Sequence, residues 1–133
     1  PKYLTEVQPG FVYGIDEQGH NKVFTIVCEG QLDAIHIDGC ALGGSEVSDQ
    51  QAILLNRLQK QIIVVPDRDK AGSKLVEQAI DLGWSVAMPE WSQDVNDVGE
   101  AVSKYGRLFT LYSIVNIAED SPLKIRLRAK KWF

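Results

Sequence analysis

The chain contains few cysteines and histidines and no long apolar segment. Its two cysteines, Cys28 and Cys40, are too few for a disulfide framework, and both lie in apolar stretches where a buried thiol is expected. A reducing, cytoplasmic setting follows. The two histidines, His20 and His36, are isolated, so no Cys/His spacing resembles a zinc site. No apolar run approaches the ~20 residues that a membrane helix needs, which predicts no membrane partner.

Length and composition indicate one domain. The 133 residues suffice for a single core, and 44% hydrophobic with 24% charged residues is ordinary for a globular protein. The chain begins at Pro1 without a methionine and shows no signal peptide. We therefore expect a piece of a longer polypeptide.

The net charge of −4 is unevenly distributed. Residues 121–133 contain no acid and five of the 14 basic residues, and without them 9 basic residues remain against 18 acidic ones, a charge of −9. An acidic body argues against indiscriminate nucleic-acid binding. It suits a domain whose phosphate contacts come from a metal or a neighbouring segment, and the alternative is a solvated basic end or linker.

Apolar, strand-like runs alternate with helical segments along most of the chain. The runs occupy residues 23–28, 40–42, 62–66 and 84–88. Helical patterns follow at 32–37, 48–58, 71–82, 97–106 and 107–118, with Ser48 and Asp97 as N-caps and Gly83 as a C-terminal stop. This alternation predicts an α/β fold with a central, mainly parallel four-stranded sheet flanked by helices.

The ends of the chain differ from this pattern. Glycines among aromatic and β-branched residues predict a short N-terminal strand pair within residues 1–22. We expect residues 23–106 to form the α/β domain proper. Residues 107–133 are expected to form a C-terminal helix and a basic tail that leads to a further subdomain.

Acidic residues follow the first and third predicted strands. Glu29 ends the first strand with no lysine or arginine nearby, so it needs a metal or a proton-transfer role. Asp67 and Asp69 follow the third strand at i and i+2, where extended geometry would point both side chains the same way. Because functional groups of parallel sheets gather beyond the carboxyl ends of the strands, we expect these acids to share a Mg²⁺ site.

Neighbouring residues support this site. Gly30 and Gly72 let the chain turn close to the sheet. Asp33 either begins the first helix or contributes to the site. Arg68 points away from the acidic pair and contacts a phosphate or pairs with an acid, whereas Lys70 is the better phosphate candidate.

The loop after the fourth strand adds two more acids at the same edge. Asp97 is interpreted mainly as the cap of the following helix, and it is a possible site residue. Asp94 is the better candidate for a second metal. Four consecutive loops that converge on one edge indicate function more strongly than any single motif does.

With these residues in view, the chain resembles the Toprim domain of primases, topoisomerases and some nucleases. The motif Glu-Gly-x-x-Asp is complete at residues 29–33, and Asp-x-Asp-x-x-Gly is complete at residues 67–72. The likeness is closest to DnaG-type primases of bacteria and phages. It includes Pro-Lys-Tyr-Leu at 1–4, Ala-Leu-Gly-Gly at 41–44 and Asp-Val-Asn-Asp at 94–97, and it covers roughly residues 1–106.

The resemblance implies a DNA primase domain that makes RNA primers. Glu29, Asp67, Asp69 and Asp94 would hold two or more Mg²⁺ or Mn²⁺ ions, with Glu29, Asp67 and Asp69 as the catalytic residues. A single-stranded DNA template and ribonucleoside triphosphates would be the partners, together with a replicative helicase bound through absent regions. The setting would be the cytoplasm of a bacterium or a phage-infected host.

The sequence departs from the family at Val95, which replaces a proline, and at Asn96, which replaces a second aspartate. We expect the zinc-binding domain that reads the template in primases to be missing from this portion. Whether this portion makes primers by itself is an open question. Two alternatives also remain open. One is a Toprim nuclease or repair protein that cuts phosphodiesters, and the other is a non-catalytic Toprim DNA-binding module.

Overall fold

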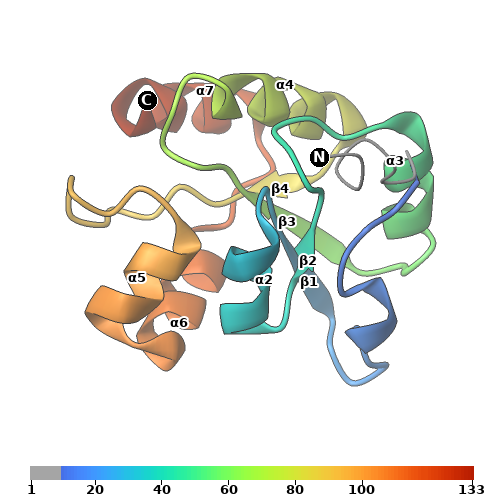
Figure 1. Ribbon diagram of the computed structural model, residues 1–133. Helices are drawn as coiled ribbons and strands as arrows, with labels where there is room; N and C mark the ends of the chain where they lie inside the picture. Colours follow the sequence, from blue (N-terminus) through green and yellow to red (C-terminus); the bar gives the residue numbers. More distant parts are fainter. Residues whose placement is uncertain (1–9) are drawn as a thin grey trace, which may run out of the picture.

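A four-stranded parallel sheet forms the centre of the molecule. The computed structural model describes residues 10–133. Its strands are β1 (Phe24–Cys28), β2 (Cys40–Ala41), β3 (Gln61–Val65) and β4 (Ser85–Val86), and they lie in the order β2-β1-β3-β4 (Figure 1). Every pairing is parallel. The predicted α/β fold with a parallel sheet is confirmed.

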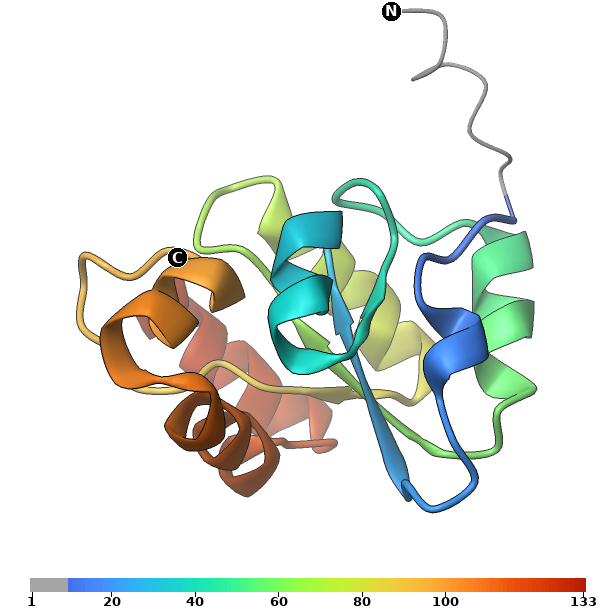
Figure 2. The same ribbon diagram turned by 60° about the horizontal axis from the view of Figure 1, so that its bottom comes forward.

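Helices cover both faces of this sheet. Figure 2 shows α2 (Gln31–Ile37) in front of the strands and α4 (Gly72–Leu82) behind them. The remaining helical elements are η1 (Ile15–Glu17), α3 (Asp49–Asn56), α5 (Val98–Tyr105), α6 (Arg107–Ile117) and α7 (Pro122–Trp132). None of the helices within residues 10–133 has the length and apolar character needed to cross a bilayer.

The core lies around the two central strands. Val27 in β1 and Val64 in β3 are completely buried, and the two residues pair directly in the sheet. Central strands covered on both faces carry continuous apolar sequences, which is why these runs are identifiable from the sequence. Cys28 and Cys40 are buried free thiols, as predicted.

Capping residues begin or end three helices at the positions that the sequence predicts. Ser48 begins α3 with a capping box, in which its hydroxyl accepts a hydrogen bond from the Gln51 amide and the Gln51 side chain accepts one from the Ser48 amide. The carboxylate of Asp97 caps α5 by accepting a 2.8 Å hydrogen bond from the Glu100 amide. Gly83 ends α4 with a φ of 75°. All three predicted helix boundaries are confirmed.

The N-terminal segment differs from the expected strand pair. Residues 10–22 form η1 and one antiparallel bridge, between Tyr13 and Ala41 at the free edge of β2. Gly14 has a φ of 79°, which turns the chain into the 3-10 helix instead of extending it. The rest of that prediction, including the primase-like residues 1–4, lies outside the described residues.

The basic segment 121–133 is a packed helix. Ile125 and Trp132 of α7 are buried in the core, and Arg126 pairs with Glu77 of α4 at 3.0 Å. The segment before α7 also pairs with the sheet, through an antiparallel bridge between Glu119 and Val86. The sequence alone suggests a charged tail, because basic residues dominate this segment and only two of its side chains, Ile125 and Trp132, are buried. The division of the chain at residue 106 stays a prediction.

Candidate metal centre

Glu29 lies at the carboxyl end of β1, beside the loop that follows β3. Its side chain is 7% exposed, and its Oε2 accepts a 2.7 Å hydrogen bond from the backbone amide of Asp67. The two strands bring these residues together because Cys28 pairs with Val65 as the last residue of each strand. A buried carboxylate is thus fixed at the edge where parallel sheets bind ligands.

Asp67 is the second acid of this edge, and its pKa is raised more than that of any other acid described here. Burial, together with the nearby carboxylates of Glu29, Asp33, Asp97 and Asp69, raises its pKa to about 7. Burial also raises the pKa of Glu29, although the hydrogen bond from the Asp67 amide opposes that shift. None of the five acids forms a salt bridge within residues 10–133. The site therefore holds uncompensated negative charge.

Asp69 is close to the pair, but its side chain is turned toward α4. The backbone is not extended between the two aspartates, because the Asp69 amide donates to the Asp67 carbonyl at 2.9 Å. Oδ1 of Asp69 in turn accepts a hydrogen bond from the Gly72 amide at 3.1 Å. The prediction that extended geometry aligns both carboxylates was wrong, because the chain bends at residues 68–69 before α4 begins at Gly72.

Gly72 is required by the close packing of this site. A Cβ at this position would lie 2.6 Å from the Asp67 carbonyl oxygen and 3.2 Å from Oε2 of Glu29. At Gly30 a Cβ would lie 3.3 Å from Oδ2 of Asp33, which is a milder restriction. Both glycines allow the loops to approach the acids, and their direct part in phosphate binding stays a prediction.

Asp33 links α2 to α5. Its Oδ1 accepts a 2.8 Å hydrogen bond from the Gly99 amide. Burial raises the pKa of Asp33, and the Asp97 charge adds to that effect. Asp33 therefore has a structural role in joining two helices and also contributes to the negative field of the site. Asp97 caps α5 at the border of the same cluster.

Asp94 lies at the outer border of the acidic cluster, where it lines a shallow pocket together with Asp33 and Asp97. It is exposed and forms an ion pair with Lys104 at 3.0 Å. Hydrogen bonds from Ser92 and then Lys104 lower the pKa of Asp94. Its role as a metal ligand stays a prediction that would require it to leave Lys104.

The basic residues of the motif point in different directions. Arg68 points away from the acidic pair, as predicted, and its guanidinium lies 4.2 Å from the ring centroid of Trp132. It also donates to the Ser92 carbonyl at 3.1 Å. Lys70 is exposed, and its ammonium makes no ion pair within residues 10–133. Sequence reasoning missed the contact of Arg68 with Trp132, because nothing local indicates that the chain end packs there.

The donor set fits a hard divalent cation that keeps part of its water shell. No three Asp, Glu, His or Cys side chains among residues 10–133 form a complete metal-ligand cluster. Glu29 and Asp67 nevertheless provide two adjoining carboxylates. Mg²⁺ is often bound by one or two carboxylates, with waters and substrate phosphates as its other ligands.

Comparison with known protein families finds a match for the segment that contains these acids. Residues 26–100, more than half of the chain, match the family described as Toprim-like. The chain belongs to the Toprim-like family. The matched segment of this Toprim-like domain contains Glu29, Asp67 and Asp69 and ends within α5.

Solved primase cores share the fold of this Toprim-like domain. A structure of the DnaG catalytic core superposes with a TM-score of 0.66 at 20% identity, over 84% of this chain and 41% of that one. The E. coli primase catalytic core gives a TM-score of 0.68 at 17% identity, over 91% and 43% of the two chains. This chain thus spans about two fifths of either core. Comparison with curated proteins gives no match.

Proposed function

We propose that the chain is the Toprim catalytic domain of a DNA primase, which joins ribonucleotides into primers on single-stranded DNA. The observation that carries this proposal is the contact between Glu29 and Asp67. The Asp67 amide fixes the Glu29 carboxylate, so the acids that follow two different strands lie close enough to interact at the ligand-binding edge of the sheet. No cationic side chain among residues 10–133 forms a salt bridge with either of them.

Glu29 and Asp67 would hold Mg²⁺ or Mn²⁺, with Asp69 as the adjoining ligand. The bound ion would neutralise the incoming triphosphate and activate the primer 3′-hydroxyl. The Asp67 amide fixes the orientation of the Glu29 carboxylate through Oε2. No described side chain donates to the carboxylate of Asp67, so its oxygens can accept a cation.

The basic residues of the motif would serve the substrate in different ways. Lys70 is exposed beside the acids and would bind a phosphate. Arg68 is held by Trp132 and by the loop after β4, so it would position the backbone of the motif more than bind a phosphate itself. Gly30 and Gly72 would allow a phosphate to approach the backbone. Asp94 would join a second metal only after it releases Lys104.

The fold comparisons support the primase assignment over the other Toprim activities. Both solved neighbours are described as primase or DnaG catalytic cores, and they superpose over more than four fifths of this chain.

Two measurements on the 133-residue chain test the proposal. Calorimetric titration with MnCl₂ should show binding that is lost in Asp67→Asn and Glu29→Gln. Primer synthesis on single-stranded DNA with ribonucleoside triphosphates and Mg²⁺ should be lost in the same variants. Asp49→Asn is the matched control, because Asp49 is an exposed acid in the first turn of α3.

Each alternative function predicts a different experimental outcome. Metal-dependent nicking of plasmid DNA without nucleotides, abolished by Asp67→Asn, would instead establish a nuclease. The absence of metal binding, together with DNA affinity that is unchanged in Glu29→Gln, would overturn the proposal in favour of a non-catalytic binding module.

A further inference from the structure

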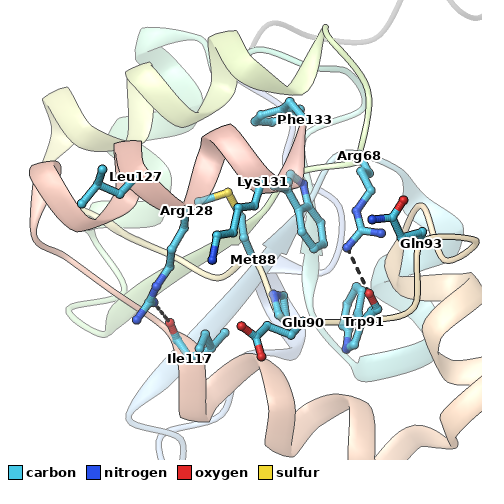
Figure 3. Close-up of a pocket in the computed structure, with 12 residues that line it drawn as sticks. Arg68, Met88, Glu90, Trp91, Gln93, Ile117, Leu127, Arg128, Lys131 and Phe133 are labelled. Carbon is cyan, nitrogen blue, oxygen red and sulfur yellow. Dashed lines mark hydrogen bonds between the residues drawn. The ribbon is translucent and has the colours of Figure 1, made fainter.

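A cavity lies next to the carboxylate site. It has a volume of about 540 Å³, is partly open to solvent, and is lined by α7, the end of α6 and the loops that follow β3 and β4 (Figure 3). This volume is within the range of about 300–1,000 Å³ that is typical of small-molecule sites. We propose that this cavity binds a nucleotide, with its phosphate at Lys131 and Arg128 and its base against the apolar wall. The inference deepens the proposed function and rests on it.

The cavity carries a positive charge on an otherwise acidic domain. Three cations, Arg68, Arg128 and Lys131, line it against one acid, Glu90. Figure 3 shows the Lys131 side chain extending into the cavity between those of Arg128 and Met88. This local excess of positive charge selects for an anion.

Lys131 is the cation that is free to meet a ligand. Its ammonium makes no hydrogen bond or ion pair with any residue of the described chain. Arg128 is partly engaged, since it donates to the Ile117 carbonyl at 2.7 Å and lies 3.8 Å from Glu119. A phosphate could therefore gain a full charge partner at Lys131 and a second one at Arg128.

One wall of the cavity is apolar and suits a nucleobase. This wall includes Met88 and Trp132, which are largely buried, and Leu127 of α7, which is 54% exposed. The Nε of Arg68 is buried without a hydrogen-bond partner among the described residues, so the same wall also contains an unsatisfied donor. Apolar and aromatic surface with a few polar groups is the composition that planar heterocycles bind.

The cavity and the carboxylate site adjoin at Gly72. A Cβ at that position would lie 3.1 Å from Cε1 of Phe133, which lines the cavity, and 3.2 Å from Oε2 of Glu29. Asp67 and Arg68 are also consecutive residues that face the two sites separately. A nucleotide bound in the cavity would thus lie beside the acids that are proposed to handle phosphoryl chemistry.

Tryptophan fluorescence gives a direct readout, because Trp91 and Trp132 both line the cavity. Titrations of the 133-residue chain with ATP and, separately, with a short oligothymidylate are carried out in EDTA, so that no metal occupies the acidic site. We expect saturable quenching with at least one of the two probes. Saturation with ATP identifies a free nucleotide as the ligand, and saturation with the oligonucleotide alone identifies a nucleotide within a strand.

Charge reversal at neighbouring positions locates the binding. Lys131→Glu should weaken binding about tenfold or more, equivalent to about 1.4 kcal/mol. The control is Lys130→Glu, which makes the same charge change at an exposed position of α7 that does not line the cavity. Circular dichroism of both variants checks that α7 remains folded.

The outcomes separate this inference from the proposed function. Equal weakening by Lys130→Glu and Lys131→Glu, or no quenching by either probe, would overturn the cavity assignment. Binding that requires Mg²⁺, is lost in Asp67→Asn and is unchanged in Lys131→Glu would also overturn it, while the carboxylate site would stand. Binding in EDTA that depends on Lys131 and is kept in Asp67→Asn would establish the cavity even if primer synthesis were absent.

Discussion

The backbone amide of Asp67 donates a 2.7 Å hydrogen bond to Oε2 of Glu29, across a separation of 38 residues in the sequence. This contact joins the ends of β1 and β3 and fixes one carboxylate by means of the residue that carries the other. The bond offsets part of the cost of burying Glu29, but it brings two negative side chains together.

Asp67→Asn should stabilise the metal-free protein at neutral and alkaline pH. The pKa of Asp67 is about 7 in the folded state against 3.8 as the reference, so the folded protein binds the proton more tightly. The stability contributed by this group is full at low pH and is lost as the pH rises from about 4 through 7. Allowing for solvent screening of a half-buried group, we expect a gain of about 1–2 kcal/mol in the variant at about pH 8.

Urea denaturation in EDTA at about pH 5 and about pH 8 measures this effect. The gain should be larger at the higher pH, whereas Asp49→Asn should change stability little at either. An Asp67→Asn protein that is less stable than the wild type at about pH 8 would contradict the proposed repulsion among the acids.

Mg²⁺ or Mn²⁺ should stabilise the protein, and EDTA should reverse the effect. A ligand at ten times its dissociation constant adds about 1.4 kcal/mol to the free energy of unfolding. Because protons compete for Asp67, the shift in melting temperature should be larger at about pH 8 than at about pH 6. Glu29→Gln should abolish the shift, and a shift that persists in this variant would place the cation elsewhere.

The sequence predicted the parts of the fold that depend on local signals. The four strands were identifiable because buried parallel strands are continuously apolar, and three helix ends were identifiable from Ser48, Asp97 and Gly83. Glu29 and Asp67 could be placed together because the topology alone brings the ends of parallel strands to one edge.

Contacts between distant segments were not predictable in the same way. The direction of Asp69 depends on a bend at residues 68–69 and on its hydrogen bond from the Gly72 amide, and the acidic pattern predicts neither. The pairing of Asp94 with Lys104 depends on the path of a loop. The docking of Trp132 depends on two buried residues within a strongly basic segment, whose composition suggests a solvated tail.

Gly72→Ala should disrupt the site and destabilise the fold. The added Cβ would lie 2.6 Å from the Asp67 carbonyl oxygen, a backbone atom that cannot move without shifting the metal-site loop. We expect a loss of about 2 kcal/mol or more and loss of Mn²⁺ binding. Gly44→Ala is the matched control, since a Cβ there meets nothing within 4 Å. Equal stability of the two variants in urea would show that the Asp67 carbonyl can move aside for a Cβ at position 72.

Trp132→Phe should weaken metal binding although the Trp132 indole donates its hydrogen bond to a backbone carbonyl and not to an acid. Its indole nitrogen donates to the Pro66 carbonyl at 3.2 Å, and its ring lies under the Arg68 guanidinium, so it holds the residues on both sides of Asp67. Phenylalanine removes the hydrogen bond and should cost about 1 kcal/mol in stability.

The matched control for Trp132→Phe is Trp84→Phe. The buried Trp84 also donates an indole hydrogen bond, to Asn56 at 2.8 Å, but it lies apart from the motif. Both variants should lose similar stability in urea, and only Trp132→Phe should raise the dissociation constant for Mn²⁺. A positioning role for Trp132 predicts this split, whereas a general effect of lost stability would weaken metal binding equally in both. Equal metal affinity in the two variants would therefore show that α7 supports the fold without orienting the acids.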